Sequence, residues 1–279
     1  MKPDWRSYDA IAETYARVAE DRFAKPARDL VSLLELVPGA RVLDVGSGTG
    51  VVAVLAASMV GPTGMVVGLD CAIEMVRRLT KRCDAHAVVA VLPRLPHPDS
   101  SFDATAASFV LSHVADLAGA LEAMVRALRP GGRLAVSSWT QTESSSAPGG
   151  TWQAVMGEFV SDENLRTAIK AALPSEEKSS DPAFLEAALS AAGLIRTGIS
   201  ERTYSIEMTT RSFVEMRLIS SYGRFARSIL PDVKWARLQE ESYRRLAAMH
   251  GARVSFDLRA IFAFGCKPAS TPAPQPPVG

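Results

Sequence analysis

Residues 41–50, "RVLDVGSGTG", combine an acid with three glycines at alternate positions. Glycine adopts positive φ without strain and leaves no Cβ between the backbone and a ligand. We therefore expect Gly46, Gly48 and Gly50 to form a loop that lies flat against a bound molecule. The helix that follows would point its first N–H groups at that molecule. Asp44 adds a negative charge two residues before the first glycine.

The glycine spacing, together with the acids beside it, indicates what the loop binds. A dinucleotide fingerprint reads G-x-G-x-x-G, whereas this loop reads G-x-G-x-G. Asp44 would repel a pyrophosphate but suits a cationic amine. The run "MVVGLD" ends in Asp70, where a carboxylate can accept hydrogen bonds from both hydroxyls of a ribose. The pattern predicts a site for a ribose and an ammonium group, and it disfavours an NAD-linked oxidoreductase.

Alternating strands and helices must bring these residues together. Apolar runs predict strands over 41–46, 65–70, 85–92, 104–111 and 133–139, with helices between them, and further strands over 195–208 and 252–267. Helices are expected over 8–23 and 26–36. This rhythm predicts an α/β fold with a Rossmann-like, doubly wound, mostly parallel seven-stranded sheet, N-terminal helices and a helical cap. The carboxyl ends of its strands would hold the site.

The chain divides into five predicted parts. They are an N-terminal helical lid (1–38), a Rossmann-like core (39–140), a helical insertion (141–180), a closing α/β segment (181–267) with a helical lid insertion at 209–250, and a disordered tail (268–279).

Composition narrows the classes of partner. The 279 residues are 47% hydrophobic and 22% charged, with a net charge of +1. No basic field favours nucleic acid, and no apolar run approaches the ~20 residues that span a bilayer. The N-terminus has no apolar signal core, so we expect a cytoplasmic protein, either a monomer or a homodimer. Three cysteines without close pairing and four scattered histidines predict no metal site.

Later motifs continue the pattern in order: "LPHPDSSFD", "VLSHVADL" and "ALRPGGRL". Together with the glycine loop and "GLD", they resemble the class I S-adenosylmethionine (SAM)-dependent methyltransferases, in the small-molecule branch that includes the quinone-biosynthesis enzymes. The resemblance covers residues 8–139 well and the cap more weakly. It implies SAM as cofactor and S-adenosylhomocysteine (SAH) as product. It also implies in-line transfer of a methyl group to a small, apolar or aromatic acceptor.

The resemblance also implies which residues hold the cofactor. Asp44 would hold the ammonium and Asp70 the ribose, while Met75 would pack on the adenine. Leu92 and Ser108 would offer backbone groups, and Tyr15 would either close over the cofactor or belong to the core. The implied cofactor-binding set is Tyr15, Asp44, Gly46, Ser47, Gly48, Gly50, Asp70, Cys71, Met75, Leu92 and Ser108.

One position departs from the family. An acid that commonly bonds the adenine amino group is replaced here by Val91. Loss of one such hydrogen bond should cost about 1–3 kcal/mol, or roughly ten- to a hundredfold in affinity. This departure motivates an alternative function, that of a SAM-fold binding or accessory protein without methyl-transfer turnover.

His113 is the candidate catalytic residue, as a general base near the methyl group. Its alternative role is to cap the next helix. In the arginine-rich stretch 211–230, Arg217 or Arg224 could meet a carboxylate or phosphate of the acceptor, or the helix could simply expose a basic face. Nucleic-acid methylation is disfavoured, because "SFVLSH" stands where an N-P-P-Y or D-P-P-Y motif is expected.

Overall fold

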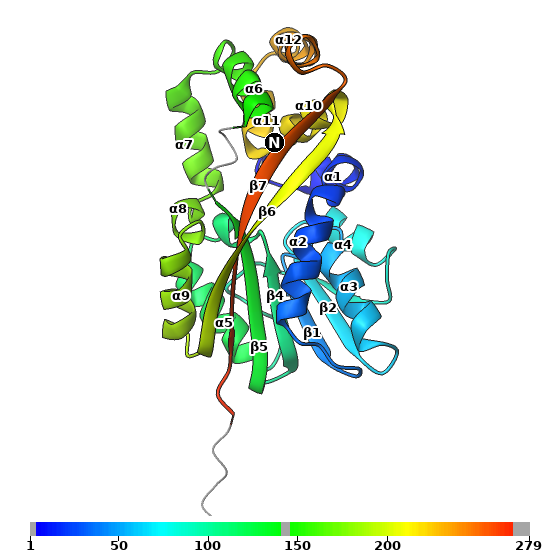
Figure 1. Ribbon diagram of the computed structural model, residues 1–279, viewed down its shortest axis with the longest axis vertical. Helices are drawn as coiled ribbons and strands as arrows, with labels where there is room; N and C mark the ends of the chain where they lie inside the picture. The colour runs from blue at the N-terminus through cyan, green and yellow to red at the C-terminus, as the bar shows by residue number, and fades with distance from the viewer. Residues whose placement is uncertain (1–3, 141–145, 270–279) are drawn as a thin grey trace, which may run out of the picture.

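The computed structural model describes residues 4–140 and 146–269, which form a seven-stranded sheet with helices on both faces and a helical cap at one end (Figure 1). The strand order is β3-β2-β1-β4-β5-β7-β6; β1 to β5 pair in parallel, and β7 runs antiparallel to both β5 and β6. The predicted seven-stranded, mostly parallel sheet is confirmed. The strands are β1 (Arg41–Val45), β2 (Met65–Asp70), β3 (His86–Val89), β4 (Phe102–Ser108), β5 (Leu128–Trp139), β6 (Ile195–Thr209) and β7 (Arg253–Cys266).

The central strands have nearly continuous apolar sequences. Helices cover both faces of a parallel sheet, so neither face of such a strand needs polar side chains. Asp44 of β1 lies in register with Gly68 of β2 and Ala106 of β4. The carboxyl ends of these strands therefore bring Asp44, Asp70 and Ser108 to one edge of the sheet.

Helices cover both faces of this sheet. One buried core lies under α2 (Glu20–Leu33) and α3 (Val51–Val60) and continues into the cap. The other lies under α5 (Leu117–Ala127) and α9 (Pro182–Ala191). The short helix α4 (Ile73–Leu79) joins β2 to β3 and contacts both strands.

The N-terminal helices differ from the sequence prediction in where they break. The structure has a 3-10 turn η1 (Asp9–Ile11), then α1 (Ala12–Val18), and α2 begins at Glu20 with Pro26 inside it. The predicted boundary before Pro26 is therefore wrong. A proline inside a helix removes one hydrogen bond, but here Pro26 lies on the face of α2 that Ala27, Leu30 and Val31 bury in the core. Burial of that face stabilises the helix through the proline.

Two sets of helices form the cap. The first lies between β5 and α9, and the second lies between β6 and β7. The antiparallel strands β6 and β7 extend together from the sheet into this cap (Figure 1). The first set is α6 (Ala147–Gly157), α7 (Asp162–Ala172) and α8 (Glu176–Ser179), and the second is α10 (Thr210–Leu218), α11 (Ser221–Ile229) and α12 (Asp232–His250).

Nearly all of the predicted disordered tail, 268–279, lies outside the described residues, which end at 269. The helical insertion predicted from 141 also begins outside them, since residues 141–145 are not described. Within the described ranges, no helix is both long and apolar enough to cross a membrane.

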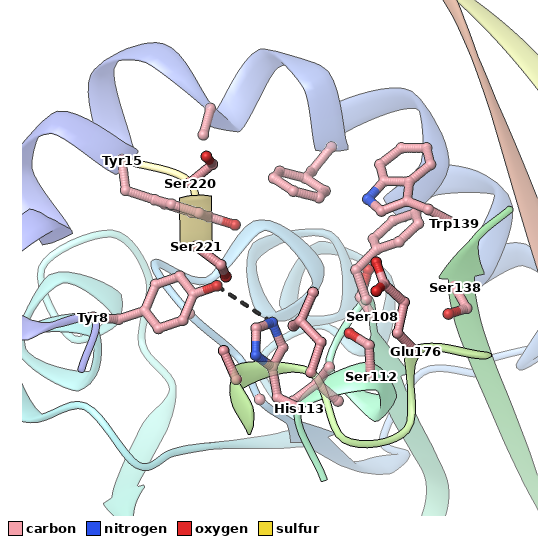
Figure 2. Close-up of a pocket in the computed structure, with 18 of the residues that line it drawn as sticks. Tyr8, Tyr15, Ser108, Ser112, His113, Ser138, Trp139, Glu176, Ser220 and Ser221 are labelled. Carbon is pink, nitrogen blue, oxygen red and sulfur yellow. Dashed lines mark hydrogen bonds between the residues drawn. The ribbon is translucent and has the colours of Figure 1, made fainter. Parts of the chain in front are cut away.

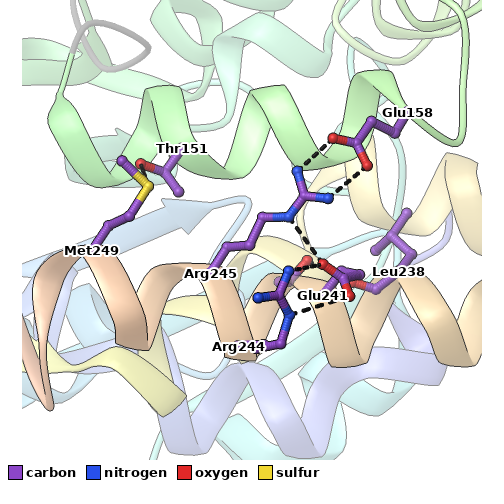
Figure 3. Close-up of polar contacts among 8 residues, drawn as sticks. Thr151, Glu158, Leu238, Glu241, Arg244, Arg245 and Met249 are labelled. Carbon is purple, nitrogen blue, oxygen red and sulfur yellow. Dashed lines mark hydrogen bonds and ion pairs between the residues drawn. The ribbon is translucent and has the colours of Figure 1, made fainter.

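An ion network joins the two halves of the cap (Figure 3). Arg245 of α12 binds both carboxylate oxygens of Glu158, the residue that follows α6, with Nη2 to Oε2 at 2.8 Å. Arg245 and Arg244 also both bind Glu241, and they lower the pKa of that carboxyl to about 2. At the other end of the pair of helices, Thr151 Oγ1 lies 2.9 Å from His250 Nε2.

We expect Arg245→Ala to lower the melting temperature by a few degrees at most, because exposed ion pairs contribute little in water. The effect should shrink further in high salt, which screens these charges. Arg253→Ala is the matched control for loss of one ion pair outside the network. Arg253 has a single exposed partner, Glu207, with Nη2 and Oε2 3.7 Å apart. Thermal melts at low and high salt check this, and a salt-independent loss would contradict it.

Candidate functional site

A cavity of about 640 Å³ lies at the carboxyl edge of the sheet, between the core, the N-terminal helices and the cap. Figure 2 shows Tyr8 and Tyr15 on one side of it, His113 at its base, and Trp139 and Glu176 on the far side. The ends of β1, β2 and β4 supply Asp44, Asp70 and Ser108 to its wall. The predicted location of the site is therefore where the structure has its cavity.

The three glycines of the loop share positive φ but serve different purposes. Their φ angles are +66° at Gly46, +53° at Gly48 and +94° at Gly50. A Cβ on Gly46 would lie 2.4 Å from Cγ2 of Val110, and one on Gly50 would lie 2.5 Å from Cδ1 of Leu79. A Cβ on Gly48 would meet nothing within 4 Å. Only Gly48 leaves open space beside the backbone, and it lines the cavity whereas Gly50 does not.

Asp44 is a buried carboxyl group that faces the cavity. It is 0% exposed, and neither oxygen has a hydrogen-bond partner among the described residues. Burial raises the pKa of Asp44 to about 8. The backbone N–H of Ala53 opposes this rise in part, but it does not form a hydrogen bond with either carboxyl oxygen. A buried carboxylate without partners is costly. A cationic group in the cavity would compensate that cost.

Asp70 has a structural role beside its predicted one. Its Oδ2 accepts a hydrogen bond from the Gly48 N–H and its Oδ1 accepts one from the Ala72 N–H, both at 2.9 Å. Asp70 therefore fixes the glycine loop to the start of the next segment. Each carboxylate oxygen can accept a further hydrogen bond, so this role leaves room for ribose hydroxyls. Burial raises the pKa of Asp70.

The structure brings most of the other predicted cofactor residues to the same cavity. Leu92 does not reach it: its side chain packs on the second core, while the neighbouring Val91 is 64% exposed. The residues that do line it are Tyr15, Ser47, Cys71, Met75 and Ser108. Ser47 is buried, and its Oγ has no hydrogen-bond partner among the described residues.

His113 lines the cavity from a 3-10 turn, η2 (Leu111–His113), and pairs with a residue that the sequence prediction missed. Its Nε2 lies 3.3 Å from the hydroxyl of Tyr8, with the two rings edge to face (Figure 2). Burial and the charge of Arg224 lower the pKa of His113 to about 4. Burial also raises the pKa of Tyr8. Near neutral pH the phenol and the imidazole are therefore both uncharged, and the tautomer of His113 decides which of them donates the hydrogen bond.

The signal for Tyr8 in the sequence is weak. It lies seven residues before Tyr15, two helical turns away, and the structure places the two rings edge to face at 6.1 Å. Helical spacing could have paired the tyrosines. The partner of Tyr8 is 105 positions away in the chain, and only the fold brings it close.

Aromatic rings continue along the cavity from Tyr15 toward the cap. Tyr15 stacks on Phe23, which packs on Phe109, and Phe109 stacks on Trp139 at 4.0 Å. The guanidinium of Arg22 lies 4.6 Å from the Trp139 ring. These rings form a continuous aromatic stretch of the cavity wall.

The two cap arginines that the sequence singled out lie in different places. Arg217 of α10 lines the cavity, with its guanidinium over the rings of Trp152 and Phe213. Arg224 of α11 does not line it and is buried behind Tyr8. In the ranges that the structure describes, no group of three or more histidines, cysteines and carboxylates is placed to hold a metal ion.

Comparisons with known proteins agree with this geometry. Residues 43–136 match a family model described as a methyltransferase domain. A demethylmenaquinone methyltransferase from Mycobacterium sp. (strain KMS) is 39% identical over 136 residues, which are 48% of this chain and 56% of that protein. The nocamycin O-methyltransferase of Saccharothrix syringae is 35% identical, over 47% and 49% of the two chains. The chain thus spans about half the length of these relatives.

Solved structures share the fold at low sequence identity. The Haemonchus contortus phosphoethanolamine N-methyltransferase 2, in complex with phosphomonomethylethanolamine and SAH, aligns with a TM-score of 0.56 at 16% identity, over 95% of this chain and 60% of that chain. A [4+2]-cyclase, SpnF, aligns with a TM-score of 0.51 at 20% identity, over 88% and 82%. Because a methyltransferase and a cyclase share this fold, the fold alone does not define the reaction.

The glycine loop and its two acids lie within the matched residues. Residues 43–136 thus match the methyltransferase-domain family model, and the chain shares its fold with solved methyltransferases.

Proposed function

We propose that this protein binds SAM in the cavity and transfers its methyl group to a small apolar or aromatic acceptor. The observation that carries the proposal is Asp44, a fully buried carboxyl group that has no partner among the described residues and that faces the cavity. Open space beside Gly48 and the unpartnered Ser47 hydroxyl lie in the same wall. A ligand with an ammonium group and a ribose matches these three features.

The residues fit that cofactor in a defined order along the edge of the sheet. Asp44 would hold the ammonium, Gly48 would let the ligand approach the backbone, and Asp70 would accept hydrogen bonds from the ribose. When bound, SAM supplies a methyl group on a positively charged sulfur. In such a transfer the acceptor would gain a bond to the methyl carbon, and the bond from that carbon to sulfur would break with its electron pair left on sulfur.

The chain contributes position and environment to this step. The aromatic wall excludes water, which favours a displacement that consumes a charge, and the cavity aligns the acceptor with the methyl group. For an acceptor that must lose a proton, neutral His113 is the acceptor of that proton, with Tyr8 beside it. A base with a pKa of about 4 is weak, so we expect alignment to contribute more than proton removal.

The relatives support the small-molecule class of acceptor. Two of them are named as a demethylmenaquinone methyltransferase and a nocamycin O-methyltransferase. The rings of Phe23, Phe109 and Trp139 provide a surface for a flat or apolar acceptor of that kind.

The test has two stages. Calorimetry should detect binding of SAM and SAH in the micromolar range and no binding of NAD. Incubation with methyl-labelled SAM and a panel of phenols, quinols and amines should then label at least one acceptor. Absence of binding at millimolar SAM and SAH would overturn the proposal. Binding without any labelled product would favour the accessory role that Val91 suggested.

A further inference from the structure

Arg224 is a buried cation whose partners are two carbonyl groups, a serine hydroxyl and an aromatic ring. It lies on α11 and is 7% exposed. Its Nη1 donates to the carbonyl oxygens of Arg6 at 2.9 Å and of Ser7 at 3.0 Å. Among the described residues, no carboxylate forms an ion pair with it. Burying an arginine in this way is costly, so its place in the fold needs an explanation.

Beyond its own helix, where Nη2 lies 3.5 Å from the Ser221 hydroxyl, the contacts of Arg224 fall on one short piece of chain. It binds the carbonyls of residues 6 and 7, and its guanidinium carbon lies 4.1 Å from the centre of the Tyr8 ring. The planar fork of an arginine can hold two carbonyls and stack on a ring at the same time. A lysine has a single ammonium and cannot reproduce both contacts. Arg224 therefore fixes the backbone before Tyr8 and one face of its ring.

The other contacts of Tyr8 fix its hydroxyl. The hydroxyl reaches Nε2 of His113, and the ring edge meets Tyr15. Figure 2 shows Tyr8 directed at the imidazole across the cavity. Three elements thus hold one side chain: α11 through Arg224, α1 through Tyr15, and η2 through His113.

We propose that Arg224 is a positioning residue that acts through Tyr8, holding its hydroxyl against His113. This role rests on the proposed function, because it matters for the reaction only if Tyr8 and His113 face a bound acceptor. It joins the second half of the cap to the N-terminal segment, since α11 follows Tyr8 by more than 200 residues. Correct placement of Tyr8 then requires that α11 be packed on the N-terminal segment.

Charge provides a second effect of the same contact. Tyr8 of the N-terminal segment contacts the imidazole, and the guanidinium of Arg224 on α11 lies against the Tyr8 ring. Glu176 of α8 and Asp70 of β2 share the cavity. Of these, Arg224 lowers the pKa of His113, together with burial. Removing this charge should therefore raise the pH at which His113 gains its proton.

The experiment compares Arg224→Gln with Arg227→Gln in the cofactor-free protein. Arg227 is the matched control because it lies on the same helix but points to solvent and pairs with Asp232 at 2.8 Å. Proton NMR would follow the titration of His113, assigned with a His113→Gln variant, and the nuclear Overhauser effects between the Tyr8 and His113 rings. SAH binding would be measured on each protein.

We expect Arg224→Gln to weaken the Tyr8–His113 Overhauser effects and to raise the His113 midpoint by roughly half to one pH unit. Arg227→Gln should match the wild type. Arg224→Lys should keep the low midpoint but recover the Overhauser effects only in part. Unchanged Overhauser effects in Arg224→Gln would overturn the proposal.

Two further comparisons distinguish failure of this proposal from misfolding of the variant and from failure of the proposed function. If Arg224→Gln shows no cooperative melt, Arg224→Lys is compared with Arg227→Lys, and equal Overhauser effects in that pair overturn the proposal. If wild-type protein fails to bind SAH, the proposed function fails, while the NMR comparison still reports whether Arg224 positions Tyr8.

Discussion

Cofactor affinity should rise about tenfold for each pH unit between pH 6 and 8, and Asp44→Asn should remove this dependence. The pKa of Asp44 is about 8 in the cofactor-free protein, so the carboxyl carries a proton at neutral pH. An ammonium favours the ionised form, so binding must release that proton. One proton released corresponds to a tenfold change in affinity per pH unit. At pH 8, Asp44→Asn should bind roughly 10- to 100-fold more weakly, through loss of a charge-assisted hydrogen bond.

Calorimetry in two buffers with different ionisation enthalpies would count the protons released. Adenosine is the matched ligand control, because it has the ribose and base without the ammonium. Its affinity should not vary over this range. A flat pH profile for SAH in the wild type would show that no ammonium meets Asp44.

The same group makes stability depend on pH in the absence of cofactor. The carboxyl of Asp44 holds its proton up to about pH 8 in the folded chain, whereas its ordinary value is 3.8. Between these two values the folded state binds the extra proton, so the free energy of unfolding falls as pH rises. Asp44→Asn should flatten that part of the profile in urea unfolding.

The second large effect separates the glycines of the loop. Gly46→Ala should destabilise the fold by about 3 kcal/mol, because its Cβ would overlap the stiff side chain of Val110. Gly48→Ala has a similar positive φ but open space beside it, so it should cost only about 1 kcal/mol. We expect Gly48→Ala instead to weaken cofactor binding by tenfold or more, because the new methyl enters the space that the cofactor would occupy.

Each variant serves as the control for the other, since both place alanine at positive φ. Urea unfolding would give the stability of each, and calorimetry with SAH its affinity. If Gly48→Ala bound SAH as the wild type does, the open space beside its backbone would not be part of the cofactor site.

The sequence predicted the sheet well, because buried parallel strands leave long apolar runs. The runs at 65–70, 195–208 and 252–267 correspond closely to β2, β6 and β7. Helix boundaries were less predictable. Local rules end a helix before a proline, yet α2 continues through Pro26, because its buried face is defined by a core that no local rule contains.

The candidate site was predictable where chemistry is local. The acid and glycines of residues 44–50 lie on one loop, and their spacing alone indicated a cavity wall. The pairing of Tyr8 with His113 and Arg224 was not predictable, since it joins residues more than 100 positions apart. The purpose of each glycine was also hidden, because the side chains of Val110 and Leu79 that crowd Gly46 and Gly50 come from other elements.

The antiparallel pairing of β6 with β7 affects which changes in chain length this fold can accept. Thr209 at the end of β6 pairs with Arg253 at the start of β7, and the Thr210 N–H donates to the carbonyl of Ala252 at 2.9 Å. The segment that carries α10, α11 and α12 therefore leaves and re-enters the sheet at adjacent positions. The strand pairing holds the two ends of this segment together. The entropic cost of closing a loop between such ends grows only slowly with the number of residues in the loop. We therefore expect the segment that carries α10, α11 and α12 to tolerate changes in length while β6 and β7 keep their register.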